Sequence, residues 1–195
     1  LQLAQSLYER HKVITYPRTD SKALPEDYGP TCRELLGVLP NELAPFGKKV
    51  LEAGWVDEKN KRIFNNKQIS DHFAIIPTNK TPSTLDANEW KIFNLIAKRF
   101  ISVFYPPAQW DVTTRTSKLG QHSFKTEGRV LVEPSWLAIY GKDNQPADTL
   151  APLTDADQNK AKLLESKMET DQTKPPPRYS EATLLSAMEL SLIHI

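Results

Sequence analysis

The sequence predicts an α+β chain in which helices come first, antiparallel strands follow, and a further helix lies near the end. Between residues 86 and 104, apolar side chains recur every three or four positions, as they do on one face of a helix. From residue 110 onward, apolar and polar residues alternate instead, and Gly120 and Gly128 separate the runs, which is typical of strands. Three prolines at 175–177 then precede the last predicted helix.

The composition is that of an ordinary globular protein. Of the 195 residues, 39% are hydrophobic and 25% are charged, and the net charge is +1, so any surface for nucleic acid must be a local patch. The single cysteine, Cys32, excludes an internal disulfide and fits a reducing, cytoplasmic compartment. No apolar run approaches the length that spans a membrane, so no membrane partner is expected. The chain begins at Leu1 in a helical pattern, and we expect it to be an internal fragment of a longer polypeptide.

The first half of the chain is predicted to be mostly helical. An amphipathic helix is expected over residues 1–11, with His11 at its negative carboxyl end as a partner for the helix dipole. Two short helices are expected over 31–39 and 43–53, because prolines interrupt the pattern between them. The polar, lysine-rich stretch 56–68 predicts a surface loop or an irregular hairpin.

Extended segments and strands make up the remainder. Residues 71–78 predict a short buried strand or extended segment, since an apolar run there ends at a proline. Antiparallel strands joined by short turns are expected between 110 and 140, with 136–140 as a further strand. Residues 141–173 are polar and acidic and predict a connector, with a last strand near 160–166.

The most distinctive stretch reads VITYPRTDS and begins at residue 13. Pro17 fixes its own φ and keeps Tyr16 out of the helical region, so Tyr16 and Arg18 should share one face of an extended chain. A phenol becomes a useful nucleophile when a cation stabilises its phenolate, and a guanidinium binds phosphate through two parallel hydrogen bonds. The pair therefore suits attack on a phosphodiester. An ordinary strand end with a half-buried tyrosine and a solvated arginine would look the same.

Two further places are candidates for loop capping or phosphate binding. Asp20 or Ser21 can cap a turn that would hold the residues before it in a fixed loop. Ser180 is expected to cap a helix over 181–189, directly after Arg178. Backbone N–H groups, the helix dipole and a guanidinium would converge there on a DNA phosphate. A capped helix after a proline linker, with no binding role, remains the alternative.

Three motifs together resemble one family. The string ITYPRTDS at 14–21 is similar to the active-site tyrosine motif of type IA DNA topoisomerases, and its proline resembles the topoisomerase III branch. The string DHFAIIPT at 71–78 is similar to the family's H-x-A-I-x-P-T segment. The string PPPRYSEATL at 175–184 is similar to its PPxR[YF][ST]EAxL segment. The three occur in the family's order and span most of the chain.

The resemblance implies a bacterial, ATP-independent isomerase that cuts and rejoins one DNA strand through a 5′-phosphotyrosyl intermediate, to relax negative supercoils or to decatenate DNA. Tyr16 would be the nucleophile, and Arg18 would bind the scissile phosphate. The residues expected to shape the loop or to contact single-stranded DNA are Thr19, Asp20, Ser21, His72, Arg178 and Ser180. Without the resemblance, a lone histidine such as His72 is more often a structural residue.

The resemblance also divides the chain into parts. Residues 1–105 resemble the mostly helical domain that carries the active-site tyrosine, residues 106–173 resemble an antiparallel β arch segment with its connector, and residues 174–189 resemble the start of a helical DNA-binding domain. The family holds Mg²⁺ in an acidic N-terminal domain, which we expect to be absent, so no metal site is expected here and the fragment alone should be inactive. The expected partners are DNA, especially single-stranded DNA, and the remaining domains of the same polypeptide.

Two other classes of enzyme fit the sequence less well. A tyrosine recombinase would need further arginines and a histidine upstream of a tyrosine late in the chain, whereas Tyr16 lies near the start. A relaxase would need paired histidines for a metal, and His11, His72 and His122 are not paired. A non-catalytic piece that only binds single-stranded DNA is also compatible with the motifs. Residues 190–195 read LSLIHI, depart from the family pattern, and match the translation of a sequencing-library adapter, so we expect a non-native tail there.

Overall fold

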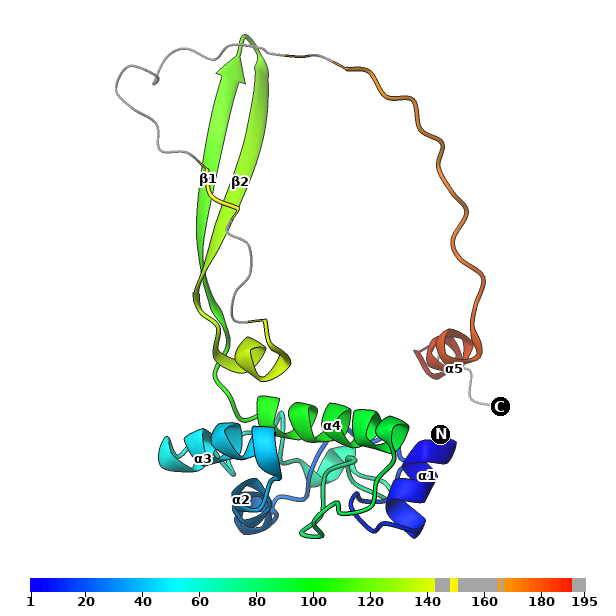
Figure 1. Cartoon of the computed structure of the whole chain (residues 1–195). Coiled ribbons are helices and arrows are strands. Elements are labelled where there is room, and N and C mark those ends of the chain that lie inside the picture. The colour runs from blue at the N-terminus through cyan, green and yellow to red at the C-terminus, as the bar shows by residue number, and fades with distance from the viewer. Residues whose placement is uncertain (143–147, 151–164, 166, 191–195) are drawn as a thin grey trace. The chain divides into compact units, whose positions relative to one another are not determined.

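The computed structural model describes residues 1–142, 148–150, 165 and 167–190. The chain divides into two units, Leu1–Ala151 and Pro152–Ile195, and each is described by itself. The first contains helices and one antiparallel pair of strands, and the described part of the second contains one helix (Figure 1). This mixture confirms the predicted α+β class, while the predicted domain limits stay a prediction.

All four helices predicted for the first unit are present, with small shifts at their ends. They are α1 (Gln2–Glu9), α2 (Gly29–Gly37), α3 (Ala44–Glu52) and α4 (Ala87–Ser102). Short 3₁₀ turns are η1 (Asn41–Leu43), η2 (Asn66–Gln68) and η3 (Ser135–Tyr140). Both α1 and α3 pack against α4, and α2 packs against α3 (Figure 1). In the part of the chain that the structure describes, no helix is long and apolar enough to cross a bilayer.

Helix α4 is the central element of the core. It begins with a capping box, in which Asp86 accepts the N–H of Glu89 and the Glu89 carboxylate accepts the N–H of Asp86. The predicted apolar stripe faces inward, and its buried members are Phe93, Ala97, Phe100, Ile101 and Phe104. The helix therefore forms for two consistent reasons, a stabilised first turn and one continuous buried face.

The polar stretch 56–68 is irregular, as predicted, but it is anchored in the core. Ile63 and Phe64 are buried within it. The N–H of Leu24 donates to the Ile63 carbonyl at 2.7 Å, and the N–H of Asn65 donates to the Leu24 carbonyl at 2.9 Å. Ile63 and Phe64, two apolar neighbours in a largely polar run, thus fix the loop against the chain that follows the VITYPRTDS stretch.

The prediction that His11 is a partner for the α1 dipole is wrong. The His11 Nε2 atom lies 3.1 Å from Oε1 of Glu89, and Ser6 Oγ donates to the same oxygen at 2.6 Å. The His11 and Glu89 side chains are each only 7% exposed. A carboxylate partner shielded from water attracts the imidazole more strongly than a solvent-exposed helix end does. The three side chains thus join α1 to α4.

The Glu89 network predicts an acid-dependent stability. The hydrogen bond from Ser6, helped by the Asp86 N–H and by His11, holds the pKa of Glu89 below its ordinary value of 4.5. A carboxylate with a lowered folded-state pKa stabilises the fold above its unfolded-state pKa, and this contribution is lost as pH falls through the folded-state value. We therefore expect the melting temperature, followed by circular dichroism, to decrease on acidification below pH 4.5.

Variants separate this carboxylate from the others in the chain. Glu89→Gln should lower the melting temperature at neutral pH and should reduce its dependence on acid. Glu34→Gln, at an exposed position on α2, should leave both properties unchanged. An acid dependence of Glu89→Gln equal to that of the unmodified chain would contradict the assignment.

The strands form a long antiparallel hairpin (Figure 1). Strand β1 (Gln109–Leu119) pairs with β2 (His122–Glu133), and the register places Thr114 opposite Glu127. The turn uses Gly120 at φ 60°, a left-handed conformation that glycine adopts without steric cost. His122 is exposed on β2.

The predicted strand over 136–140 is wrong, because these residues belong to the 3₁₀ turn η3. Pro134 precedes the turn with helical dihedrals, and its carbonyl accepts the N–H of Leu137 at 2.9 Å. Ser135 and Ile139 are buried, and Gly141 ends the turn with φ 66°. A proline start and a left-handed glycine end favour a short helical turn over a strand.

A bridge beside β2 depends on Gly128. Arg129 and Asp148 exchange backbone hydrogen bonds of 2.8 and 3.1 Å. A Cβ at Gly128 would lie 2.4 Å from the Asp148 carbonyl oxygen and 2.9 Å from the Leu150 nitrogen, closer than atoms can approach. The absent side chain therefore lets a returning segment lie against the hairpin. The strand predicted near 160–166 falls almost entirely outside the described residues.

Substitution of Gly128 by alanine should break that bridge. We expect the amide of Arg129 to lose protection from hydrogen exchange, because its acceptor on Asp148 must move away. The matched control is Thr126→Ala, an exposed position on the same strand, which should leave the Arg129 amide protected. Unchanged protection in Gly128→Ala would show that the close approach does not hold the returning segment.

The described part of the second unit contains α5 (Glu181–Leu190), close to the predicted helix. Ser180 Oγ accepts the N–H of Thr183 at 3.2 Å, and Thr183 Oγ1 accepts the N–H of Ser180 at 2.8 Å. The predicted cap is thus confirmed, with a threonine in the place that glutamate takes in a capping box. Residues 191–195, most of the predicted non-native tail, lie outside the described residues.

Candidate active site

Backbone hydrogen bonds bring the tyrosine and histidine motifs together. The N–H of Thr15 donates to the Ile76 carbonyl at 3.0 Å, and the N–H of Thr78 donates to the Val13 carbonyl at 2.9 Å. The Thr15 hydroxyl accepts the N–H of Ile76 at 2.9 Å and donates to the Ala74 carbonyl at 3.2 Å. The second motif is thus the extended segment that the sequence predicts, held against the first.

Tyr16 lies between two other rings at the edge of the core. Its ring centroid is 4.3 Å from that of His72, with the planes inclined at 44°, and 5.3 Å from that of Tyr8, which meets it edge to face. Tyr16 is half-buried, and His72 is exposed. The phenol is thus held by neighbours on both sides without being enclosed in the core.

Arg18 and His72 line the same small cavity. Its volume is about 160 Å³, and its lining residues are Arg18, Thr19, Asp20, Ser70, Asp71 and His72. Tyr16 is not among them, but its ring packs against His72. The imidazole of His72 thus contacts the Tyr16 ring and lines a cavity with Arg18, while the shared face expected for Tyr16 and Arg18 stays a prediction.

Hydroxyl groups fix the loop that follows Arg18. Thr19 Oγ1 donates to the His72 carbonyl at 2.8 Å and accepts the N–H of Ser21 at 3.0 Å. Ser21 Oγ donates to the Gln68 carbonyl at 2.8 Å and accepts the N–H of Ala23 at 3.2 Å. Ser21 therefore caps a turn, as predicted, and Thr19 caps another that the sequence analysis did not identify.

The charges around the cavity are mixed. Arg18 is exposed, and its guanidinium has no ion-pair partner within the described ranges of the chain. Asp20 and Asp71 also line the cavity, and Ser70 Oγ lies 3.5 Å from Oδ1 of Asp20. Among the residues that line this cavity, Arg18 supplies the guanidinium that would attract an anion, at a position next to the imidazole.

The residues predicted from the third motif lie in the second unit. Arg178 is exposed, and Ser180 uses its hydroxyl to cap α5. Because the two units are described separately, a role for Arg178 or Ser180 beside Tyr16 stays a prediction.

Sequence reasoning missed three neighbours of the predicted site residues. Tyr8 packs edge-on against Tyr16, and Ser70 and Asp71 line the cavity beside Arg18. The sequence pattern predicts an amphipathic helix over residues 1–11, but a helical period does not say which ring Tyr8 meets. Asp71 adjoins the histidine in its motif, and that adjacency was the available signal.

Comparisons with known proteins agree with the motifs. A sequence model of the family described as DNA topoisomerase matches residues 1–193. DNA topoisomerase 3 of Bacillus licheniformis is 38% identical over 199 aligned positions, and that of Bacillus subtilis is 36% identical over 199; each alignment covers 97% of this chain. The chain spans 27% of the length of these relatives. With a family match over nearly its whole length, the chain belongs to the DNA topoisomerase family.

Proposed function

We propose that this chain supplies the nucleophile of an ATP-independent type IA DNA topoisomerase, which relaxes negative supercoils or decatenates DNA in the cytoplasm. The observation that carries the proposal is the position of His72, whose ring packs against that of Tyr16 and which lines one cavity with Arg18. A phenol, an imidazole and an unpaired guanidinium within one site suit the transfer of a phosphoester. The family membership of the chain supports the same reaction.

In the proposed reaction, the Tyr16 oxygen attacks the phosphorus of one DNA strand. The phenol gives up its proton as a tyrosyl oxygen–phosphorus bond forms, the bond from phosphorus to the 3′ oxygen breaks, and that oxygen takes up a proton and leaves as a 3′-hydroxyl. After the other strand has passed, the 3′-hydroxyl loses its proton and attacks the phosphorus, and the tyrosyl oxygen leaves and is protonated to the phenol. One phosphoester replaces another, so the cycle requires no nucleoside triphosphate.

Arg18 binds the scissile phosphate in this proposal and stabilises the charge that develops on its oxygens. His72 keeps the phenol ring in orientation through its ring contact. Thr19, Asp20 and Ser21 shape the loop that presents the guanidinium, and Arg178 and Ser180 position the single strand before cleavage.

The family resemblance also implies Mg²⁺. Among the residues that the structure describes, no group of three or more His, Cys, Asp or Glu side chains is arranged to hold a metal ion. The carboxylates of Asp20 and Asp71 at the cavity do not make such a set. The described residues therefore do not fit a Mg²⁺ ion, and the proposed steps use none.

We expect the 195-residue chain alone not to relax plasmid DNA, since it spans 27% of its relatives' length.

The linkage itself tests the proposal. The complete polypeptide that contains this chain is incubated with single-stranded DNA labelled at one end and is denatured during the reaction. A 3′ label should remain with the protein, a 5′ label should be released, and mass spectrometry should locate the adduct on Tyr16. Retention of the 5′ label would indicate a 3′-phosphotyrosyl linkage, as in tyrosine recombinases, and would overturn the proposal.

A further inference from the structure

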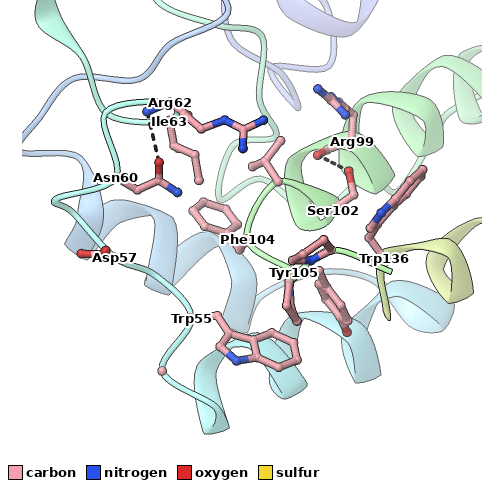
Figure 2. Close-up of a pocket in the computed structure, with 14 residues that line it drawn as sticks. Trp55, Asp57, Asn60, Arg62, Ile63, Arg99, Ser102, Phe104, Tyr105 and Trp136 are labelled. Atoms are coloured by element: carbon pink, nitrogen blue, oxygen red, sulfur yellow. Dashed lines mark hydrogen bonds between the residues drawn. The ribbon is translucent and has the colours of Figure 1, made fainter. Parts of the chain in front are cut away.

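A second and larger cavity lies in the first unit, where the loop after α3, the end of α4 and η3 meet (Figure 2). Its volume is about 660 Å³, and it shares no lining residue with the cavity at Arg18. Pockets of this size accommodate molecules as large as a nucleotide. The proposed chemistry at Tyr16 does not use it.

Two arginines give this cavity a positive side. Arg62 and Arg99 line it, both are exposed, and in Figure 2 their side chains lie on the side opposite Trp55. The Arg62 N–H donates to Asn60 Oδ1 at 3.1 Å, and the Arg99 carbonyl accepts from Ser102 Oγ at 2.9 Å, so both backbones are held. In the described portion of the chain, neither guanidinium has an ion-pair partner.

Aromatic rings form much of the rest of the lining. Trp55 is half-buried and meets Tyr105 edge to face at 4.9 Å, and the Tyr105 hydroxyl donates to the Phe46 carbonyl at 3.1 Å. Trp136, on η3, is 37% exposed. The cavity therefore combines fixed aromatic surface, part of it open to solvent, with unpaired guanidinium groups.

The remaining charges leave this region positive. Asp57 is the acidic residue among those that line the cavity. Lys49 adds a further positive charge next to the cavity, because its Nζ lies 5.9 Å from the ring centroids of both Trp55 and Tyr105. Because the whole chain carries a net charge of only +1, this is a local concentration of positive charge rather than part of a general field.

We propose that this cavity binds one nucleotide of single-stranded DNA, with the base stacked on the exposed indole of Trp136 and the phosphate held by Arg62 and Arg99. Aromatic faces and cations in one groove are how proteins bind single strands without reading their sequence. A duplex would not fit this chemistry, since its bases already stack on one another. The inference rests on the proposed function insofar as that function makes DNA the substrate.

The test is binding of a fluorescein-labelled oligodeoxythymidylate to the full chain, followed by fluorescence anisotropy over a range of salt concentrations. The double variant Arg62→Gln, Arg99→Gln should bind more weakly and should reduce the slope of log affinity against log salt by about 0.7 for each phosphate that the protein no longer neutralises. Trp136→Leu should weaken binding about fivefold or more, whereas Trp136→Phe, which retains a ring, should weaken it less.

The controls match the variants in chemistry. Arg33→Gln removes an exposed guanidinium that pairs with Glu58 outside the cavity, and it should leave oligonucleotide affinity unchanged. The melting temperature of every variant is measured by circular dichroism to confirm that it is folded. We expect no loss of folding, because each substituted side chain is exposed. A polyglutamate competitor distinguishes nucleotide binding from simple attraction of anions.

Three results would overturn the inference. They are no binding by the unmodified chain, equal binding by the cavity variants, and displacement of the oligonucleotide by polyglutamate with no effect of Trp136→Leu. The two proposals fail separately. If the Tyr16 adduct forms but the cavity variants bind the oligonucleotide as well as the unmodified chain does, only the cavity proposal is wrong. If the cavity variants bind more weakly but no Tyr16 adduct forms, only the proposed reaction is wrong.

Discussion

Tyr16→Phe should abolish covalent capture of DNA by the complete polypeptide while leaving DNA binding intact. The change removes one oxygen atom and retains the ring that packs against Tyr8 and His72. Since the removed oxygen is the proposed nucleophile, we expect cleavage to fall by more than about 1,000-fold, to the background of the assay. The measurement is the yield of protein–DNA adduct after denaturation, beside an anisotropy measurement of DNA affinity.

The matched control for this variant is Tyr8→Phe. It removes a phenolic oxygen from the adjoining ring and retains the edge-to-face contact with Tyr16. Adduct yield should then stay close to that of the unmodified protein. Full adduct formation by Tyr16→Phe would assign the nucleophile to another residue, and weaker DNA affinity in that variant would give the phenol a binding role instead.

Arg18→Ala should produce the second large effect, a decrease in cleavage rate of about 100- to 1,000-fold, because the developing charge on the phosphate loses its cation. The cleavage rate of Arg18→Lys should lie between those of Arg18→Ala and the unmodified protein. Lysine retains the charge but lacks the planar guanidinium that makes two parallel hydrogen bonds. Single-turnover cleavage of a labelled strand measures both. The chain fold should not change, because the Arg18 side chain is exposed.

Arg10→Ala is the control for Arg18, since it removes another exposed guanidinium, at the end of α1. Its cleavage rate should match that of the unmodified protein. The contradicting outcome is that Arg18→Ala weakens DNA binding without slowing cleavage of the DNA that is bound. In that case the guanidinium would contribute to substrate binding and not to stabilisation of the transition state, and its proposed role at the developing charge would be wrong.

The helices were predictable because local and tertiary signals agree. In α4, the apolar stripe and the N-terminal cap at Asp86 both indicate the same helix. After Trp110, the alternation of apolar and polar residues indicates strands, and β1 lies there. The prediction failed where the chain is short and apolar, as over 136–140, because a strand and a 3₁₀ turn can bury the same residues. There, the proline before the segment and the glycine after it carried the decisive information.

The site was only partly predictable. Motif resemblance named Tyr16, Arg18 and His72, and the structure joins them through one ring contact and one cavity. It did not name Tyr8, since the approach of two rings depends on how α1 is held against α4. The partner of His11 was missed for the same reason, because Glu89 is distant in sequence and only tertiary packing brings them together.

The threonine and serine hydroxyls beside the site have a consequence for how this protein can vary. Their hydrogen bonds join the two ends of a long segment of the chain, which begins after Ser21 and ends at Gln68 and His72. Lengthening a closed loop costs only a small, logarithmic amount of entropy. Natural or engineered insertions at the solvent-exposed turn around Lys59 should therefore leave the surroundings of the phenol undisturbed, which makes that turn a suitable place for a reporter or a tether.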